Sequence, residues 1–187
     1  MVRQIEALAM MVGNQEKERD KSMWKRLLHT DNDYGATIAR ITLGVVLLPH
    51  GAQKLLGWFG GGGVSGTIGY FDSALGVPAA LTLLVIAAES FGALALVLGF
   101  VSRFAALGAA AVMVGAIALV HASNGFFMNW AGAQAGEGFE FHLLAIGLAL
   151  VVMVKGAGAL SIDRTLIGTA EEHAAEEEHE ERRLAAA

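Results

Sequence analysis

Three ionisable residues, Arg40, Glu89 and Glu140, lie inside or at the edge of long apolar stretches of the chain. A charged side chain at the centre of a bilayer costs at least about 2.5–3.5 kcal/mol, so such residues generally face a bundle interior and find a partner there. Carboxylates in such surroundings can hold and pass protons. The three residues therefore predict a polar site within an apolar protein, but they do not by themselves name its chemistry.

The composition is that of a membrane protein with polar ends. The 187 residues are 55% hydrophobic and only 17% charged, against about 25% charged in an ordinary soluble domain. Six of the 13 Lys and Arg residues precede Thr30, and seven of the 18 acidic residues follow Asp163. No charged residue occurs between Phe104 and Gly136. The lipid bilayer is the expected partner, with membrane or cytoplasmic proteins or further copies of the chain beside it, and nucleic acid is not.

The chain contains no cysteine, which excludes disulfides, thiolate metal sites, cysteine-ligated iron–sulfur clusters and a dithiol redox centre within it. Its first 30 or so residues are charged throughout and lack the apolar core of a cleavable signal peptide. His50 and His121 alone do not predict a metal site. Nothing in the chain itself indicates a flavin or haem.

Four apolar stretches are each long enough to cross a bilayer, which needs about 20 helical residues. They cover residues 36–56, 77–100, 104–122 and 141–160. The predicted fold class is an all-α integral membrane four-helix bundle. Residues 34–166 form this domain, residues 1–33 form a polar, amphipathic N-terminal segment, and residues 167–187 form a Glu-rich tail.

Small residues suggest how these elements pack and connect. The glycine run at residues 60–63 is expected to be a flexible link between the first two spans. A stripe of small residues along the third span is expected to let another helix approach closely. The stripe consists of Gly108, Ala111, Gly115, Ala118 and Ala122.

The distribution of basic residues predicts the orientation in the membrane. Cytoplasmic segments of membrane proteins carry an excess of Lys and Arg. The N-terminal segment is basic, Arg103 lies in the second link, and Lys155 and Arg164 follow the fourth span. The first link has only Lys54, and the third has none. Both termini are therefore expected in the cytoplasm of a bacterial cell, with the chain in the inner membrane.

With this orientation, several polar residues share the outer end of the bundle. His50 and Lys54 end the first span, His121 ends the third, and Glu140 begins the fourth. Together with Glu89 they are the candidate catalytic residues, because histidine, lysine and carboxylate groups can donate or relay protons.

Deeper in the predicted bundle, Arg40 is expected to pair with Glu89. Arg40, Gly44, Leu47, Gly51 and Lys54 share one face of the first span by the three-and-four rule. An alternative given even weight is that the ion pairs only fix helix register. His142 lies about 200° around the helix from Glu140 at 100° per residue, so it is expected outside the cluster.

The order of short motifs along these spans resembles the DoxX family of four-helix membrane proteins. The resemblance covers residues 34–166. It rests on Arg40-Ile41-Thr42-Leu43-Gly44, Pro49-His50-Gly51-Ala52-Gln53-Lys54-Leu55, Ala88-Glu89-Ser90-Phe91-Gly92, Leu98-Gly99-Phe100, Ser102-Arg103, His121, Gly138-Phe139-Glu140 and Gly156-Ala157-Gly158-Ala159-Leu160-Ser161-Ile162-Asp163.

This resemblance implies a function linked to quinones. The family takes its name from a small subunit of a thiosulfate–quinone oxidoreductase, and some relatives are connected with quinone stress and redox defence. The implied cofactor is a quinone, with Arg40, His50 and His121 as candidate contacts or supports for its headgroup. The chain is then a redox component or a subunit of a membrane oxidoreductase. The alternatives are a non-catalytic accessory subunit and a small transporter, and the sequence does not decide whether the chain is itself catalytic.

Overall fold

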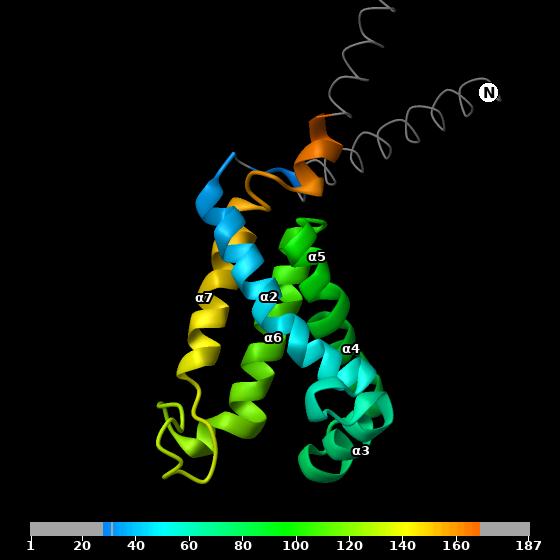
Figure 1. The fold of residues 1–187 in the computed structure, drawn as a ribbon, viewed down its shortest axis with the longest axis vertical. Helices are drawn as coiled ribbons and strands as arrows, with labels where there is room; N and C mark the ends of the chain where they lie inside the picture. Colours follow the sequence, from blue (N-terminus) through cyan, green and yellow to red (C-terminus); the bar gives the residue numbers. More distant parts are fainter. Residues whose placement is uncertain (1–27, 31, 169–187) are drawn as a thin grey trace, which may run out of the picture.

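The computed structural model describes residues 28–30 and 32–168, and these residues form helices and loops without a strand (Figure 1). The predicted all-α membrane fold is confirmed. The predicted polar N-terminal segment and acidic tail fall almost wholly in residues 1–27 and 169–187, outside the described residues. The helices are α2 (Tyr34–Leu56), α3 (Gly63–Leu75), α4 (Ala79–Ala87), α5 (Ala93–Leu98), α6 (Ser102–Ala116) and α7 (Glu140–Lys155).

Short turns of other helix types join some of these helices. A 3-10 turn, η1 (Trp58–Gly60), follows α2, and η4 (Ala122–Asn124) is a second 3-10 turn. A π-helical turn, η2 (Ala88–Gly92), joins α4 to α5, and a second, η3 (Ile117–His121), follows α6. Residues 162–168 are again helical.

Three continuous helices are long and apolar enough to cross a membrane: Tyr34–Leu56, Ala79–Leu98 and Ser102–Asn124. The fourth predicted span, residues 141–160, is shorter than expected. Its helix α7 has 16 residues and extends about 24 Å at 1.5 Å per residue. Gly156 ends it with a φ of 83°, and Gly158 follows with a φ of 74°. Glycine tolerates such positive φ angles, which other residues rarely adopt.

The helices run up and down between two ends of the bundle (Figure 1). At the lower end of that view lie α3 and the link formed by residues 125–139. At the upper end lie residues 99–101 and 156–168 and the start of α2. Helix α2 packs against α7 on one side and against α5 and η2 on the other, so it is the element that joins the two halves.

The first link is folded, although its glycines predicted a flexible segment. Gly57 ends α2 with a φ of 74°, and the chain then turns back against α2. A Cβ atom on Gly61 would lie only 2.2 Å from the carbonyl oxygen of Gln53. The 13-residue helix α3 follows and contacts both α2 and α4. The glycines therefore permit a tight reversal followed by a helix.

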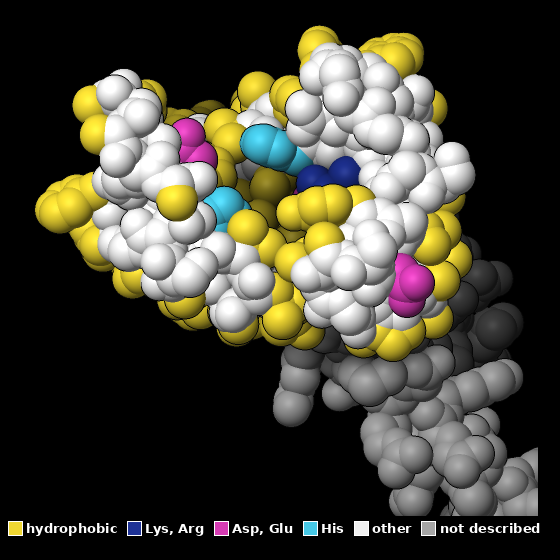
Figure 2. Space-filling model, turned by 90° about the horizontal axis from the view of Figure 1, so that it is seen from below, with side chains coloured by type: hydrophobic (Ala, Val, Ile, Leu, Met, Phe, Trp, Pro, Cys, Tyr) yellow, Lys and Arg dark blue, Asp and Glu magenta, His cyan; other side chains and the backbone are white. Residues whose placement is uncertain are grey.

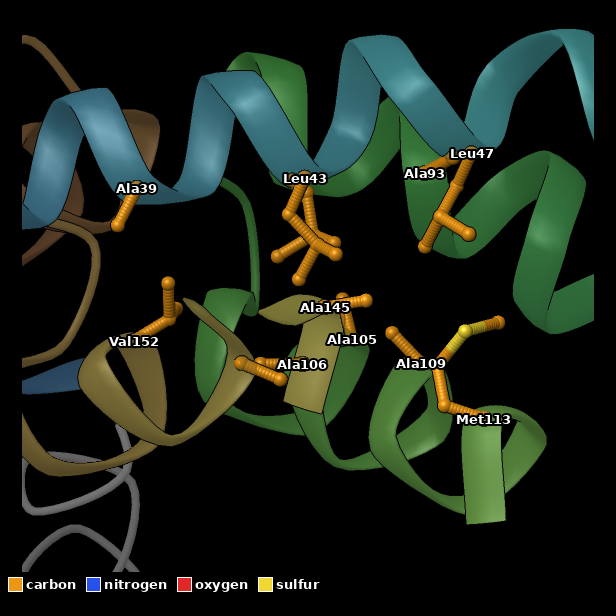
Figure 3. Close-up of a cluster of buried hydrophobic side chains, with 12 residues drawn as sticks. Ala39, Leu43, Leu47, Ala93, Ala105, Ala106, Ala109, Met113, Ala145 and Val152 are labelled. Atoms are coloured by element: carbon orange, nitrogen blue, oxygen red, sulfur yellow. The ribbon is translucent and has the colours of Figure 1, made fainter. Parts of the chain in front are cut away.

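The core is built from unusually small side chains (Figure 3). Leu43 and Leu47 of α2 point toward alanines of α6 and α7 in this view. At the α6–α7 contact, Ala106, Ala109 and Ala149 are at most 1% exposed. Alanine at these positions lets the backbones approach closely, which favours helix association in lipid.

The small-residue stripe predicted for the third span is not the face that packs. Ala111, Ala118 and Ala122 are exposed, and a Cβ atom on Gly115 would meet nothing within 4 Å. Of the stripe, Gly108 alone faces another helix, at Ala88. The third span has small residues on several faces, so their spacing could not identify the buried one.

The predicted common face of α2 is confirmed by its contacts with the second span. A Cβ atom on Gly44 would lie 2.7 Å from the carbonyl oxygen of Ala93, and one on Gly51 would lie 2.3 Å from that of Glu89. Any larger residue would push these helices apart. The two glycines therefore set the distance between α2 and the η2–α5 segment.

Arg40 closes the upper end of the bundle through backbone carbonyl groups. It is 1% exposed, and its guanidinium group donates hydrogen bonds to five carbonyl oxygens. The oxygens belong to Ala157 (2.7 Å), Leu96 (2.9 Å), Val97 (2.6 Å), Ala159 (3.4 Å) and Leu160 (2.7 Å). One side chain thus binds carbonyl groups at the end of α5 and in the segment after α7. Leu96 also accepts from the backbone N–H of Gly99, and Ala159 also accepts from Thr37 Oγ1.

Asp163 and Asp33 complete the upper end as helix caps. Asp163 is 2% exposed, and its carboxylate accepts hydrogen bonds from the backbone N–H groups of Val101 (2.6 Å) and Ser102 (2.9 Å) at the start of α6. Asp33 accepts from Ala36 and Gly35 at the start of α2. These two hydrogen bonds lower the pKa of the Asp33 carboxyl below its ordinary value.

We expect Arg40→Met to destabilise the protein severely. The substitution keeps an apolar stem but removes the guanidinium donor from five carbonyl groups, of which, among the described residues, only those of Leu96 and Ala159 have a second donor, in Gly99 and Thr37. Each buried group left unsatisfied costs about 1–3 kcal/mol. Thermal unfolding of the detergent-purified protein should show a melting temperature at least several degrees lower. Arg164→Met removes a basic residue from the same end at an exposed position and should have little effect. Equal losses in both variants would contradict this role for Arg40.

Candidate functional site

The lower end of the bundle is hollowed, and histidine side chains and a basic side chain border the hollow (Figure 2). The surface inside it is largely apolar in that view. Lys54 is the basic residue that the described chain brings to this end, because Arg40, Arg103, Lys155 and Arg164 lie toward the upper end. The histidines at this end are His50, His121 and His142, from three different helical segments.

Lys54 and Glu89 form a nearly buried ion pair between α2 and η2. Lys54 Nζ lies 2.5 Å from Glu89 Oε2, and the two side chains are 21% and 6% exposed. The predicted pairing of Arg40 with Glu89 is therefore wrong. The helix geometry behind that prediction holds, but Gly51 brings η2 against the lower part of α2, where Lys54 and not Arg40 can reach the carboxylate.

His121 and His142 pack against each other across the end of the bundle. Their ring centroids are 4.1 Å apart, with the ring planes inclined at 41°. His142 is 7% exposed, and its Nδ1 atom is buried without a hydrogen-bond partner among the described residues. The expectation that His142 lies outside the cluster is wrong. The angle between His142 and Glu140 on α7 was sound, but the cluster forms on the side of His142.

A backbone carbonyl fixes the protonation pattern of His121. Its Nδ1 atom lies 2.8 Å from the carbonyl oxygen of Glu137. Because a carbonyl oxygen can only accept, Nδ1 carries the hydrogen atom. In the neutral ring Nε2 is then the proton-accepting nitrogen. His121 is partly exposed, so it can exchange protons with the solvent at this end.

Glu140 has a structural role in the link between α6 and α7. Its Oε1 atom accepts a hydrogen bond of 2.9 Å from the backbone N–H of Met128, and Glu137 Oε2 accepts one of 2.5 Å from Asn129. The two carboxylates thereby tie the link back to the start of α7. Glu140 begins α7, two residues before His142, but its carboxylate is engaged by the backbone of the link.

Two of the polar residues lie on π-helical turns. Glu89 is in η2 and His121 is in η3. A π-helical turn inserts one residue into an α-helix and so redirects the side chains around it, and such turns are frequent at functional sites. This feature distinguishes the lower end from the rest of the bundle, and no pattern in the sequence predicts it.

The remaining candidates divide between the two ends. His50 is exposed on α2 and close enough to His142 to interact with it electrostatically. Arg40 is far up the bundle and occupied by carbonyl groups, so it does not contact this cluster. Arg103 Nη1 donates to the carbonyl of Met153 at 2.5 Å, and it also belongs to the upper end. Among the described residues, no group of three or more His, Asp or Glu side chains could hold a metal ion.

The fold and this site define a small multi-helix membrane protein with a polar cluster at one end. A family model described as DoxX matches residues 35–122. The chain is 33% identical over 134 residues to the Inner membrane protein YqjF of Escherichia coli (strain K12). The matched residues make up 72% of this chain and 93% of that relative. The chain belongs to the DoxX family. No solved structure matches it.

We expect Lys54 and Glu89 to be energetically coupled. Removing either partner leaves a charge in a nearly buried position, which costs more than the pair contributes. In unfolding measurements, Lys54→Met together with Glu89→Leu should destabilise less than the sum of the single variants, by at least about 1 kcal/mol. As a control in a second cycle, the losses in free energy of unfolding caused by Arg40→Met and Glu89→Leu should add up in the double variant. Coupling in the second cycle, or none in the first, would contradict the pairing described above.

Proposed function

We propose that the hollow at the lower end binds the headgroup of a quinone and that the protein is a quinone-linked redox component of the bacterial inner membrane. The observation that carries the proposal is the buried, unpartnered Nδ1 atom of His142 beside the His121 ring. A buried polar atom without a partner costs free energy, so it is a natural contact for a ligand oxygen. The apolar interior of the hollow suits the ring of such a ligand.

The residues around the hollow can bind and protonate a ring with two oxygen atoms. His142 can donate a hydrogen bond from Nδ1 to one oxygen, or accept one there, according to its tautomer. Lys54 can donate to a second oxygen while Glu89 holds its ammonium group in place. His121 can pass protons inward because it is partly exposed and its Nε2 atom can accept them.

When bound, a quinone supplies reversible chemistry in which two electrons and two protons convert it to a quinol. The electrons would come from a reduced partner protein in the membrane, and the protons from the solvent through His121. The residues of this chain would therefore orient the ring and move protons. An accessory subunit without a ligand site remains the alternative outcome of the experiment below.

We expect a photoreactive quinone analogue to label the lower end of the bundle. With the protein in nanodiscs, mass spectrometry of peptides should find the label near the end of α2, in η3 and at the start of α7. His142→Phe keeps a ring of similar size but removes the nitrogen atoms, and it should reduce labelling at least about fivefold, the loss of one buried hydrogen bond.

His29→Phe is the matched control, because it makes the same change in an exposed histidine at the upper end. It should leave labelling unchanged. Labelling confined to the upper end, or equal in the His142→Phe variant, would count against the quinone site and favour the accessory subunit.

We further infer that the lower end faces the periplasm and both termini face the cytoplasm, because the basic residues of the links gather at the upper end. The natural chain has no cysteine, so single cysteines report its orientation without background. Ser123→Cys, at the lower end, should react with a membrane-impermeant thiol reagent added to intact spheroplasts. Asn32→Cys, at the upper end, should react only after the membrane is opened. The reverse pattern would overturn the orientation.

A further inference from the structure

A surface depression at the upper end has the features of a lipid site. It has a volume of about 470 Å³ and is lined by Leu98, Leu160, Ser161, Ile162, Arg164 and Thr165. It lies at the other end of the bundle from the histidines, so it is separate from the proposed quinone site. Its lining combines exposed aliphatic side chains with an arginine and two hydroxyl groups.

The depression begins where the second membrane helix ends. Leu98 is the last residue of the apolar helix Ala79–Leu98 and is 48% exposed. Leu160 is 78% exposed and Ile162 is 39% exposed. Exposed aliphatic side chains beside the end of a membrane helix are suited to contact lipid acyl chains near the headgroups.

Arg164 places a positive charge in the same depression. Its Nη1 atom donates to the Oδ1 atom of Asn32, which is the one side-chain hydrogen bond of Arg164 among the described residues. A guanidinium group has five N–H donors in a planar fork that matches a phosphate group. Lys155 at the same end is instead paired with Asp33, at 3.7 Å.

The backbone that forms this depression is held in a strained conformation. Leu160 adopts a φ of 53°, which is rare for a residue with a side chain. Arg40 binds its carbonyl oxygen at 2.7 Å, and the Leu160 side chain stays outside the protein. Strain of this kind persists only where the surroundings enforce it, and it is often connected with binding.

We propose that this depression binds an anionic phospholipid, with the phosphate group at Arg164 and an acyl chain along Leu98, Leu160 and Ile162. The lipid is identified by charge complementarity with Arg164 and by the continuity of the aliphatic surface with the end of a membrane helix. The site depends on neither the quinone proposal nor the orientation of the protein, since anionic lipids can be offered in both leaflets.

Native mass spectrometry with lipids of matched acyl chains tests the proposal. The detergent-purified full chain should retain phosphatidylglycerol over phosphatidylcholine. Arg164→Gln should lower that retention about fivefold, the effect of one basic residue near a lipid surface. Lys155→Gln removes the same charge from the same end but outside the depression, and it should have little effect. Ile162→Ser should lower the retention of both lipids, because it reduces the apolar surface of the depression.

Three results would overturn the proposal. The first is equal retention of the two lipids by the natural protein. The second is an equal loss in the Arg164→Gln and Lys155→Gln variants, which would indicate a diffuse attraction to positive charge. The third is displacement of the lipid by millimolar inorganic phosphate, because the depression would then bind phosphate without the acyl chain. The circular dichroism spectrum of each variant should match that of the natural protein. If Arg164→Gln fails this check, Arg164→Lys replaces it and should keep at least half of the phosphatidylglycerol retention.

Discussion

The described fold depends on Arg40, a buried cation whose hydrogen-bond partners are backbone carbonyl groups and not a carboxylate. Arg40 donates to carbonyl groups from two separate segments, the end of α5 and the stretch after α7. Carbonyl groups at a helix end lack partners within the helix, and lipid offers none. A guanidinium group with five donors is the side chain that can satisfy several of them at once.

This arrangement explains the strained backbone of the upper end. Val101 and Leu160 both have positive φ angles, of 47° and 53°. Asp163 holds the N–H group of Val101, and Arg40 holds the carbonyl of Leu160. Two charged side chains therefore keep the short link before α6 and the segment after α7 in conformations that neither would adopt alone. With the upper end fixed in this way, the helices can diverge at the lower end and leave the hollow between them.

The sequence predicted the elements of the fold well and their partners poorly. The hydrophobic lengths located all four apolar helices, and the three-and-four rule found the face of α2 that carries Gly44, Gly51 and Lys54. Helix α3 was missed because glycine-rich sequence indicates a loop more strongly than a helix. The Arg40–Glu89 pair was mispredicted because charge alone does not reveal that carbonyl groups can be the partner of an arginine.

The site itself depended on rotations that single-helix reasoning does not supply. On a regular helix, the direction of a side chain around the axis follows from the rotation of about 100° per residue. The π-helical turns at Glu89 and His121 change this rotation, so the side chains that follow them point in other directions. The same step placed His142 correctly relative to Glu140 and still gave the wrong conclusion, because Glu140 is drawn to the backbone of the link. A carboxylate beside a folded link can be taken up by the backbone N–H groups of that link, so a shared depth in the membrane is weak evidence for catalysis. The stronger signal is a buried nitrogen without a partner, and at the lower end that nitrogen belongs to His142.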